Sequence, residues 1–222
     1  MVANRLTPLR RDLLEAFFQR EARFFLTGGA ALAGYHLGHR ETADLDLFTT
    51  ADLLADGEAT LHGAVSAING SIENIQTAPD FRRRLIRRGD ESVVVDLVRE
   101  RAPQGTQPKM QFGRVLVDPP EEILANKLCT LLARAEIRDL VDVLALEKAD
   151  HRVEAALPLA TEKDGGLTPA QLAWVLSQIT IGDDAGIPGG LSVVEIRTFV
   201  ADLIARLARL AFPGNRSDNE PR

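Results

Sequence analysis

The sequence has very little cysteine and none of the cysteine and histidine spacings that hold zinc. Its single cysteine, Cys129, cannot form an internal disulfide, and the chain contains no CxxC pair and no HExxH motif. The four histidines are scattered and do not suggest a metal cluster by themselves. Cys129 lies in an apolar helical run, so we expect a buried structural residue rather than a nucleophile. These absences exclude a disulfide scaffold and zinc sites of the usual spacing.

Long apolar runs are also missing. No stretch approaches the roughly 20 apolar residues of a membrane span, and polar residues recur every few positions near the N-terminus, unlike a signal peptide. We therefore expect a cytoplasmic protein with no membrane partner. The formal net charge of −6 argues against a protein that coats nucleic acid through bulk positive charge, although a local basic patch is compatible with it. With 222 residues, 45% of them apolar, the chain can bury one sizeable core or two small ones.

The first half of the chain mixes helix and strand patterns. Helical patterns begin at Thr7-Pro8, follow Gly28-Gly29 and recur more weakly at 52–69. Residues 103–113 are rich in Pro, Gly and Gln, which predicts a loop. Strands are expected at 23–27, 43–49, 71–77, 81–87, 92–98 and 114–117.

From Pro119 onward every pattern is helical. Helices are expected at 121–134, 138–148, 154–163, 169–179 and 193–212. The residues after 212 are too polar to pack. The sequence therefore predicts an α/β core at 1–118, a helical domain at 119–212 and a disordered tail at 213–222.

Two aspartates separated by one residue follow a glycine turn. Asp44 and Asp46 lie on one face of an expected strand, because alternate residues of a strand point to the same side. Such a pair can hold divalent cations, and magnesium prefers carboxylate and phosphate oxygens. Gly28-Gly29, without side chains, would let backbone N–H groups approach a triphosphate. The alternative is an amphipathic edge strand with a solvated acidic face after an ordinary turn.

A third carboxylate, Asp96, interrupts the apolar strand Val93–Val98. Burying an unpaired carboxylate is costly, so Asp96 needs a partner such as a cation or an arginine. It could instead lie at an exposed strand end. Together with the glycine turn, we expect Asp96 to join Asp44 and Asp46 in a two-metal site.

These residues resemble the first motif of a known family. The segments Leu26–Leu32 and His39–Phe48 are similar to that motif in the AbiEii-type nucleotidyltransferases, which are toxins of toxin–antitoxin and phage-abortive systems. The family typically shows Gly-Gly-Thr-Ala-Leu, then Arg, Ser and Asp-hydrophobic-Asp-hydrophobic-Phe. Here Ala30 replaces the Thr or Ser, which removes a hydroxyl, and Thr42 replaces the Ser. The resemblance implies the α+β fold of the DNA polymerase β superfamily, a mixed sheet with helices followed by a helical region.

A second stretch is similar to the family's helical signature Lys-Leu…Arg…Arg-Asp-x-x-Asp. It contains Lys127, Arg138, Asp139 and Asp142, and the whole resemblance covers roughly residues 22–146. The resemblance implies that Lys127 contacts the triphosphate. Arg138, Asp139 and Asp142 would then orient it or act near the acceptor. The alternative is an ordinary network of ion pairs between helices.

Two groups of arginines remain open to interpretation. Arg40, on the loop into the acidic strand, could meet phosphate or brace the carboxylates, or it could be a surface residue. The segment 81–88 holds five arginines in eight residues, which could bind an RNA backbone or protect an edge strand by charge.

The sequence therefore predicts a magnesium-dependent nucleotidyltransferase that acts on a nucleoside triphosphate. The acceptor would be tRNA or protein, and the resemblance implies a toxin with a cognate antitoxin. Two alternatives remain. One is an antibiotic-modifying enzyme that acts on small hydroxylated molecules. The other is a non-catalytic module that binds nucleotide or a partner protein, and Ala30 is the sequence feature that most favours it. The predicted nucleotide-binding residues are Gly28, Gly29, Arg40 and Lys127, and the predicted ligands of two magnesium ions are Asp44, Asp46 and Asp96.

Overall fold

The computed structural model describes residues 5–105 and 107–212. It divides the chain into two compact units, Met1–Ile123 and Leu124–Arg222. The division falls inside a helix, five residues beyond the 118/119 boundary expected from composition, because the first turn of that helix belongs to the first unit. The tail predicted to be disordered, 213–222, lies outside the described residues.

The first unit is built on a mixed seven-stranded sheet with the order β3-β4-β5-β2-β1-β7-β6. The pairs β2/β5 and β1/β7 are parallel, and the other neighbouring pairs are antiparallel. This confirms the mixed sheet expected from the sequence. The strands are β1 (Phe25–Thr27), β2 (Asp44–Thr49), β3 (Ser71–Ala78), β4 (Phe81–Arg88), β5 (Glu91–Arg99), β6 (Met110–Phe112) and β7 (Val115–Val117).

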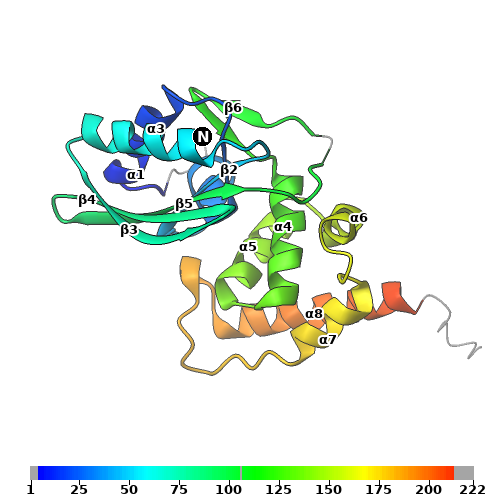
Figure 1. Cartoon of the computed structure of the whole chain (residues 1–222). Helices are drawn as coiled ribbons and strands as arrows, with labels where there is room; N and C mark the ends of the chain where they lie inside the picture. The colour runs from blue at the N-terminus through cyan, green and yellow to red at the C-terminus, as the bar shows by residue number, and fades with distance from the viewer. Residues whose placement is uncertain (1–4, 106, 213–222) are drawn as a thin grey trace, which may run out of the picture. The chain divides into compact units, whose positions relative to one another are not determined.

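Two helices, α1 (Pro8–Phe18) and α3 (Leu54–Ala67), pack against each other and against one face of this sheet (Figure 1). The rings of Phe17 and Phe24 meet edge to face in this layer, with centroids 5.6 Å apart. Leu45 and Leu47 of β2 are almost completely buried, whereas the aspartates that alternate with them are only half-buried. The core therefore lies on the leucine face of β2, and its other face is left for polar side chains.

The prediction of a loop over 103–113 is wrong for its last part, because Met110–Phe112 forms the strand β6. This strand pairs with β7, with Met110 opposite Val117. A three-residue edge strand is defined by its partner rather than by its own composition, so the Pro- and Gly-rich surroundings concealed it. The short helix expected after the glycines consists of α2 (Gly28–Ala31) and the π-helical turn η1 (Leu32–His36).

The second unit is helical. Ser192 caps the last helix with a capping box, in which its hydroxyl accepts from the Glu195 N–H and the Glu195 carboxylate accepts from the Ser192 N–H. The helices are α4 (Pro120–Ala133), which begins in the first unit, α5 (Ile137–Lys148), α6 (Val153–Lys163), α7 (Pro169–Ser177), the 3₁₀ turn η2 (Pro188–Gly190) and α8 (Val193–Ala211). Cys129 of α4, expected to be buried, is half-buried, and its thiol lies 3.5 Å from the carbonyl oxygen of Ala160.

No helix among the described residues is both long enough and apolar enough to traverse a lipid bilayer.

Candidate active site

A row of polar side chains crosses the sheet on the face opposite the leucines. Directly paired residues on neighbouring strands point to the same side, so the register places these side chains together. Asp44, two residues before Asp46, shares this face. The strand pairing therefore brings all three predicted metal ligands to one face of two adjacent strands. The polar row consists of Thr27 (β1) opposite Asp46 (β2), Asp46 opposite Asp96 (β5), and Asp96 opposite Arg83 (β4).

The glycine turn lies directly against this row. Gly28 has a φ of 65°, and a Cβ atom added there would collide with Oδ2 of Asp46. A Cβ atom added at Gly29 would lie 2.7 Å from Nη2 of Arg40. The structure therefore brings Gly28, Gly29, Arg40 and Asp46 together, and only glycine lets the backbone approach the two charged groups this closely.

Two residues of the preceding loop support the acidic strand. Thr42 is buried, and its hydroxyl donates to Oδ1 of Asp44 at 2.9 Å. Arg40 is also buried and donates to the carbonyl oxygen of Glu41 at 2.8 Å. Thr42 therefore keeps the hydroxyl of the family's Ser and uses it to orient a predicted metal ligand. Ala30, where the hydroxyl is lost, has no exposed surface.

Asp96 is paired with an arginine, one of the alternatives that the sequence left open. The Nε and Nη2 atoms of Arg83 donate to its two carboxylate oxygens at 2.8 and 2.6 Å. The side chain of Asp96 is only 7% exposed, whereas that of Arg83 is 42% exposed. A planar guanidinium that engages both oxygens is a strong, charge-assisted contact, so a different cation at Asp96 would have to displace Arg83.

The acidic residues suit magnesium in type and placement, since all three offer carboxylate oxygens on one face of neighbouring strands. Within residues 5–105 and 107–212, however, no three or more His, Cys, Asp or Glu side chains converge closely enough to hold a metal ion as they stand. In this structure both oxygens of Asp96 accept hydrogen bonds from Arg83. The three carboxylates are the ligand type that magnesium prefers, and a cation at Asp96 would require that Arg83 releases it.

Lys127 lies in the second unit, at the contact between α4 and α5. Its ammonium is 2.8 Å from Oδ1 of Asp139 and 2.6 Å from Oδ2 of Asp142, and both carboxylates are fully buried. Burial opposes the charged form of Lys127, but the carboxylates of Asp142 and Asp139 outweigh it and raise the pKa of the ammonium. Arg138 pairs with Glu136 at 2.7 Å. The interhelical ion-pair network is therefore present, and contact of Lys127 with a triphosphate stays a prediction.

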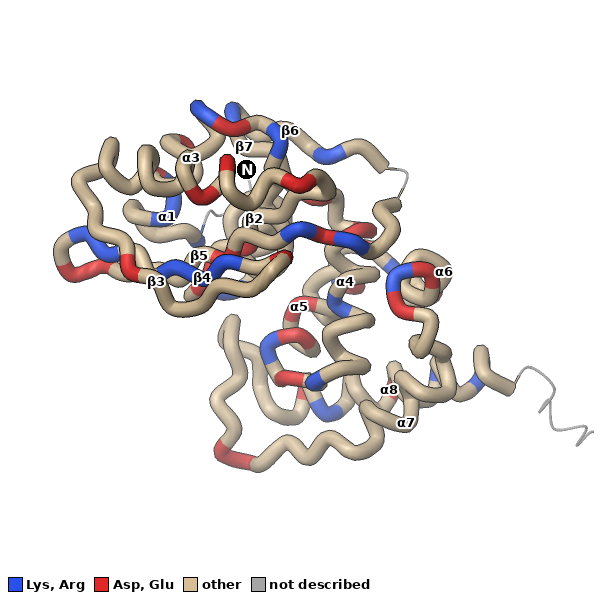
Figure 2. The backbone as a smooth tube through the Cα atoms, viewed as in Figure 1, with Lys and Arg blue, Asp and Glu red and all other residues tan. Residues whose placement is uncertain are grey.

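The arginine-rich strand β4 is not the edge strand that one interpretation of the sequence expected, because β3 lies outside it. Figure 2 shows acidic positions beside the basic ones in this region. Each arginine of this segment has a carboxylate partner in the structure, and binding of an RNA backbone by this segment stays a prediction. The pairs are Arg82 and Arg84 with Glu58, Arg83 with Asp96, Arg87 with Glu73, and Arg88 with Asp12.

Sequence reasoning missed a second cation–carboxylate pair at the far end of the row. Asp118 follows β7, has no exposed surface, and accepts from the ammonium of Lys109 at 2.5 Å. The backbone N–H of Asp118 donates to the carbonyl oxygen of Leu26 at 2.9 Å, which places Asp118 beside Thr27. Burial raises the pKa of the Asp118 carboxyl, and Lys109 opposes this shift. The available signal was a carboxylate directly after the apolar strand Val115–Val117, the same kind of signal that singled out Asp96.

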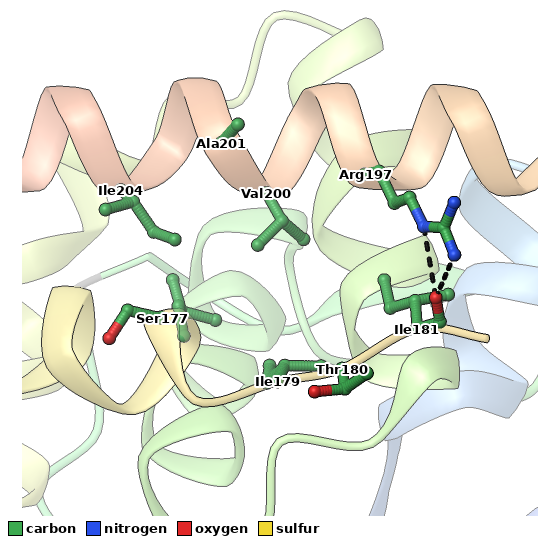
Figure 3. Close-up of a pocket in the computed structure, with 9 residues that line it drawn as sticks. Ser177, Ile179, Thr180, Ile181, Arg197, Val200, Ala201 and Ile204 are labelled. Carbon is green, nitrogen blue, oxygen red and sulfur yellow. Dashed lines mark hydrogen bonds between the residues drawn. The ribbon is translucent and has the colours of Figure 1, made fainter.

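The helical unit contains a pocket of a different kind (Figure 3). Its volume is about 360 Å³, and its walls are mainly apolar side chains from the end of α7, the following loop and α8. The charged group in its lining is Arg197, whose guanidinium donates to the carbonyl oxygen of Ile181 and pairs with Asp183 at 2.7 Å.

Comparison with known proteins gives a family and a fold. The sequence matches the family described as "Nucleotidyl transferase AbiEii toxin, Type IV TA system" over residues 11–207. The fold is similar to that of JHP933 from Helicobacter pylori, with a TM-score of 0.56 and 20% identity, over 95% of this chain and 98% of that one. It is also similar to MenT4, a nucleotidyltransferase toxin from Mycobacterium tuberculosis, with a TM-score of 0.58 and 16% identity, over 90% of this chain and 82% of that one. A search of the curated proteins found no match.

Proposed function

The chain belongs to the AbiEii nucleotidyltransferase toxin family, and from this premise we propose that it transfers a nucleoside monophosphate from a nucleoside triphosphate to a hydroxyl of tRNA or protein, with magnesium. Family membership makes the chain a nucleotidyltransferase. The observation that carries the proposal is the polar row, in which Asp46 and Asp96 face each other across β2 and β5. Asp46 also lies against Gly28, which supports the proposal that the acidic residues and the glycine turn belong to one site.

In this proposal the acidic strand residues would hold two magnesium ions. Asp44 and Asp46 would hold the ion on the nucleotide side, and Thr42 fixes the orientation of Asp44. Asp96 would complete the second site, and its carboxylate helps to take the proton from the acceptor hydroxyl. Magnesium bound there would neutralise charge on the attacking and leaving oxygens.

The other predicted residues position the triphosphate. Gly28 and Gly29 admit it close to the backbone, and Arg40, beside Gly29, offers a guanidinium to its phosphates. Lys127 supplies a further positive charge in this proposal. The acceptor oxygen then attacks the α-phosphorus, and the bond from this phosphorus to the oxygen that bridges to the β-phosphate breaks. Pyrophosphate leaves with the electron pair of that bond.

The biological role that we propose is that of a toxin with a cognate antitoxin, as the family description suggests. Nucleoside triphosphates and tRNA are cytoplasmic, so we propose that the protein acts there. The chain carries a formal net charge of −6, so recognition of a tRNA acceptor would depend on a local site rather than on bulk charge.

The first test is Asp46→Asn in the full chain. This change keeps the side-chain shape but removes the charge that would hold a cation. We expect transfer of label from nucleoside triphosphates to fall at least about a hundredfold, with an unchanged circular dichroism spectrum. Asp90→Asn, in the exposed turn between β4 and β5, is the matched control and should keep full activity. Near-normal transfer by Asp46→Asn would contradict the assigned role.

The second test identifies the acceptor. The purified chain is incubated with magnesium, each labelled nucleoside triphosphate in turn, and either total tRNA, total cell protein or an aminoglycoside. We expect label on tRNA or protein together with release of pyrophosphate. Label on the small molecule alone would instead support an antibiotic-modifying enzyme. Triphosphate binding without pyrophosphate release would support a non-catalytic module.

A further inference from the structure

Arg83 holds both oxygens of the carboxylate that the proposed second metal site requires. The two hydrogen bonds to Asp96, at 2.8 and 2.6 Å, form a fork between directly opposite residues of β4 and β5. Magnesium takes carboxylate oxygens as ligands, so a cation at Asp96 and this fork compete for the same atoms. A guanidinium does not lose its proton in proteins, which means that Arg83 has to move to give way.

The positive charge of Arg83 interacts with all three acidic residues of the proposed site and not with Asp96 alone. Its pKa is raised first by the hydrogen bonds to Asp96 and then by attraction to Asp96, Asp46 and Asp44, while burial opposes the shift. These are the three proposed metal ligands. With carboxylates gathered on one face, a positive charge among them relieves their mutual repulsion, and in the structure Arg83 supplies it.

Arg83 differs from its neighbour Arg84 in a way that makes movement feasible. The side chain of Arg83 is 42% exposed, and its guanidinium carbon lies 5.3 Å from the centre of the Phe81 ring. Arg84 is 3% exposed and is fixed by Glu58, Asn74 and the carbonyl oxygen of Gln76. Arg83 can therefore turn towards solvent, whereas Arg84 is a fixed part of the unit.

We propose that Arg83 is a built-in counter-ion of the acidic site, which occupies Asp96 until a divalent cation displaces it and so sets the cation concentration at which the site assembles. The inference rests on the proposed function, because it takes Asp96 as a metal ligand. In this inference Arg83 is a positioning residue, because it affects the cation only through its contact with Asp96. Removing the guanidinium frees the Asp96 oxygens and tightens cation binding, and it also leaves the carboxylates without compensation when no cation is supplied.

The experiment titrates the full chain with magnesium alone by calorimetry and follows thermal unfolding with and without magnesium. We expect Arg83→Gln to bind magnesium about tenfold more tightly than the unmodified chain, the scale of a lost charge-assisted contact. Without magnesium this variant should unfold at a lower temperature. Arg83→Lys keeps the charge but not the fork, so it should bind with intermediate affinity and provides a second variant should Arg83→Gln fold poorly.

The matched control is Arg87→Gln. Arg87 lies on the same strand and the same face, four residues further on, in an exposed pair with Glu73 at 2.6 Å. It should leave magnesium affinity and the response of unfolding to magnesium unchanged. An equal effect of Arg83→Gln and Arg87→Gln would mean a general charge effect and would overturn the inference.

The remaining outcomes separate this inference from the proposed function. If the unmodified chain binds magnesium, Asp46→Asn abolishes binding and Arg83→Gln binds no more tightly, the counter-ion role is wrong and the metal site stands. If the unmodified chain shows no binding but Arg83→Gln acquires it, the counter-ion role is supported. If neither binds magnesium, both the metal site and the counter-ion role fail.

Discussion

Gly28 is the residue at which the backbone meets the carboxylate of Asp46 in the proposed site. Its φ of 65° already disfavours any side chain, and a Cβ atom there would collide with Asp46. We predict that Gly28→Ala destabilises the chain by more than the roughly 1–2 kcal/mol that a left-handed residue costs, and lowers nucleotidyl transfer at least about tenfold through displacement of the carboxylate. Urea unfolding and the transfer assay would measure the two effects.

Gly89→Ala is the control for this change. Gly89 has a φ of 56° in the turn between β4 and β5, with nothing within 4 Å of an added Cβ atom. It should show the conformational cost alone and keep normal transfer. Equal losses of activity in the two variants would mean that the contact between Gly28 and Asp46 is unimportant.

Tyr35 provides a spectroscopic test of burial, because it is the only tyrosine in the chain. Burial, with a smaller effect of the Glu15 charge, raises its pKa to about 12. The raised pKa makes the stability of the fold depend on pH. This contribution is fully present below the ordinary tyrosine pKa near 10 and is lost as the pH rises through about 12. Between these values the unfolded chain releases the tyrosine proton and the folded chain keeps it. We predict a tyrosinate absorbance midpoint near 12 in the folded protein and near 10 in urea. A folded-state midpoint near 10 would contradict the burial.

The placement of single residues was predictable where their spacing along a strand determines the face on which they lie. The alternation of Asp44 and Asp46 with leucines defined one face of a strand, and the burial cost of Asp96 required a partner. The identity of that partner was not predictable. Arg83 meets Asp96 only because β4 and β5 pair in one particular register, and five arginines in that segment gave five similar candidates.

At the scale of elements, Lys127 joins α4 to α5 through two buried carboxylates. Removing one partner of a buried ion pair leaves uncompensated charge. We predict that Lys127→Met lowers the free energy of unfolding by about 3 kcal/mol, measured by urea denaturation. Lys148→Met, at an exposed position on α5 that is 3.9 Å from Glu195, should change it by less than about 0.5 kcal/mol. A similarly small effect of both changes would mean that the network does not stabilise the contact between the helices.

Helices and strands were predictable where the signals that define them lie within their own sequence. The helix α8 carries its own start signal in Ser192 and Glu195, and its expected bounds differ from Val193–Ala211 by a single residue. The strand β6 has three residues and no local signal, because its existence depends on pairing with β7. The interpretation of β4 as an edge strand failed for a related reason, since only the sheet order places β3 outside it.

At the scale of the whole molecule, the family match spans residues 11–207 and therefore includes both compact units. The acidic residues and the glycine turn lie in the first unit, and Lys127 with its carboxylates lies in the second. Composition predicted the change from a mixed sheet to helices. It could not predict that the division falls inside α4, since nothing in a continuous helical pattern marks where its packing partners change.

The polar row also couples correct folding to chemistry. Asp46 and Asp96 come from parallel strands separated by a long stretch of chain, and their meeting depends on one alignment of β2 with β5. A slip by one position would turn Asp96 in among the buried leucines and place a valine or a leucine on the polar face. A chain with that register would be less stable and would lack the proposed site, so the pairing that stabilises the sheet is also the one that assembles the site.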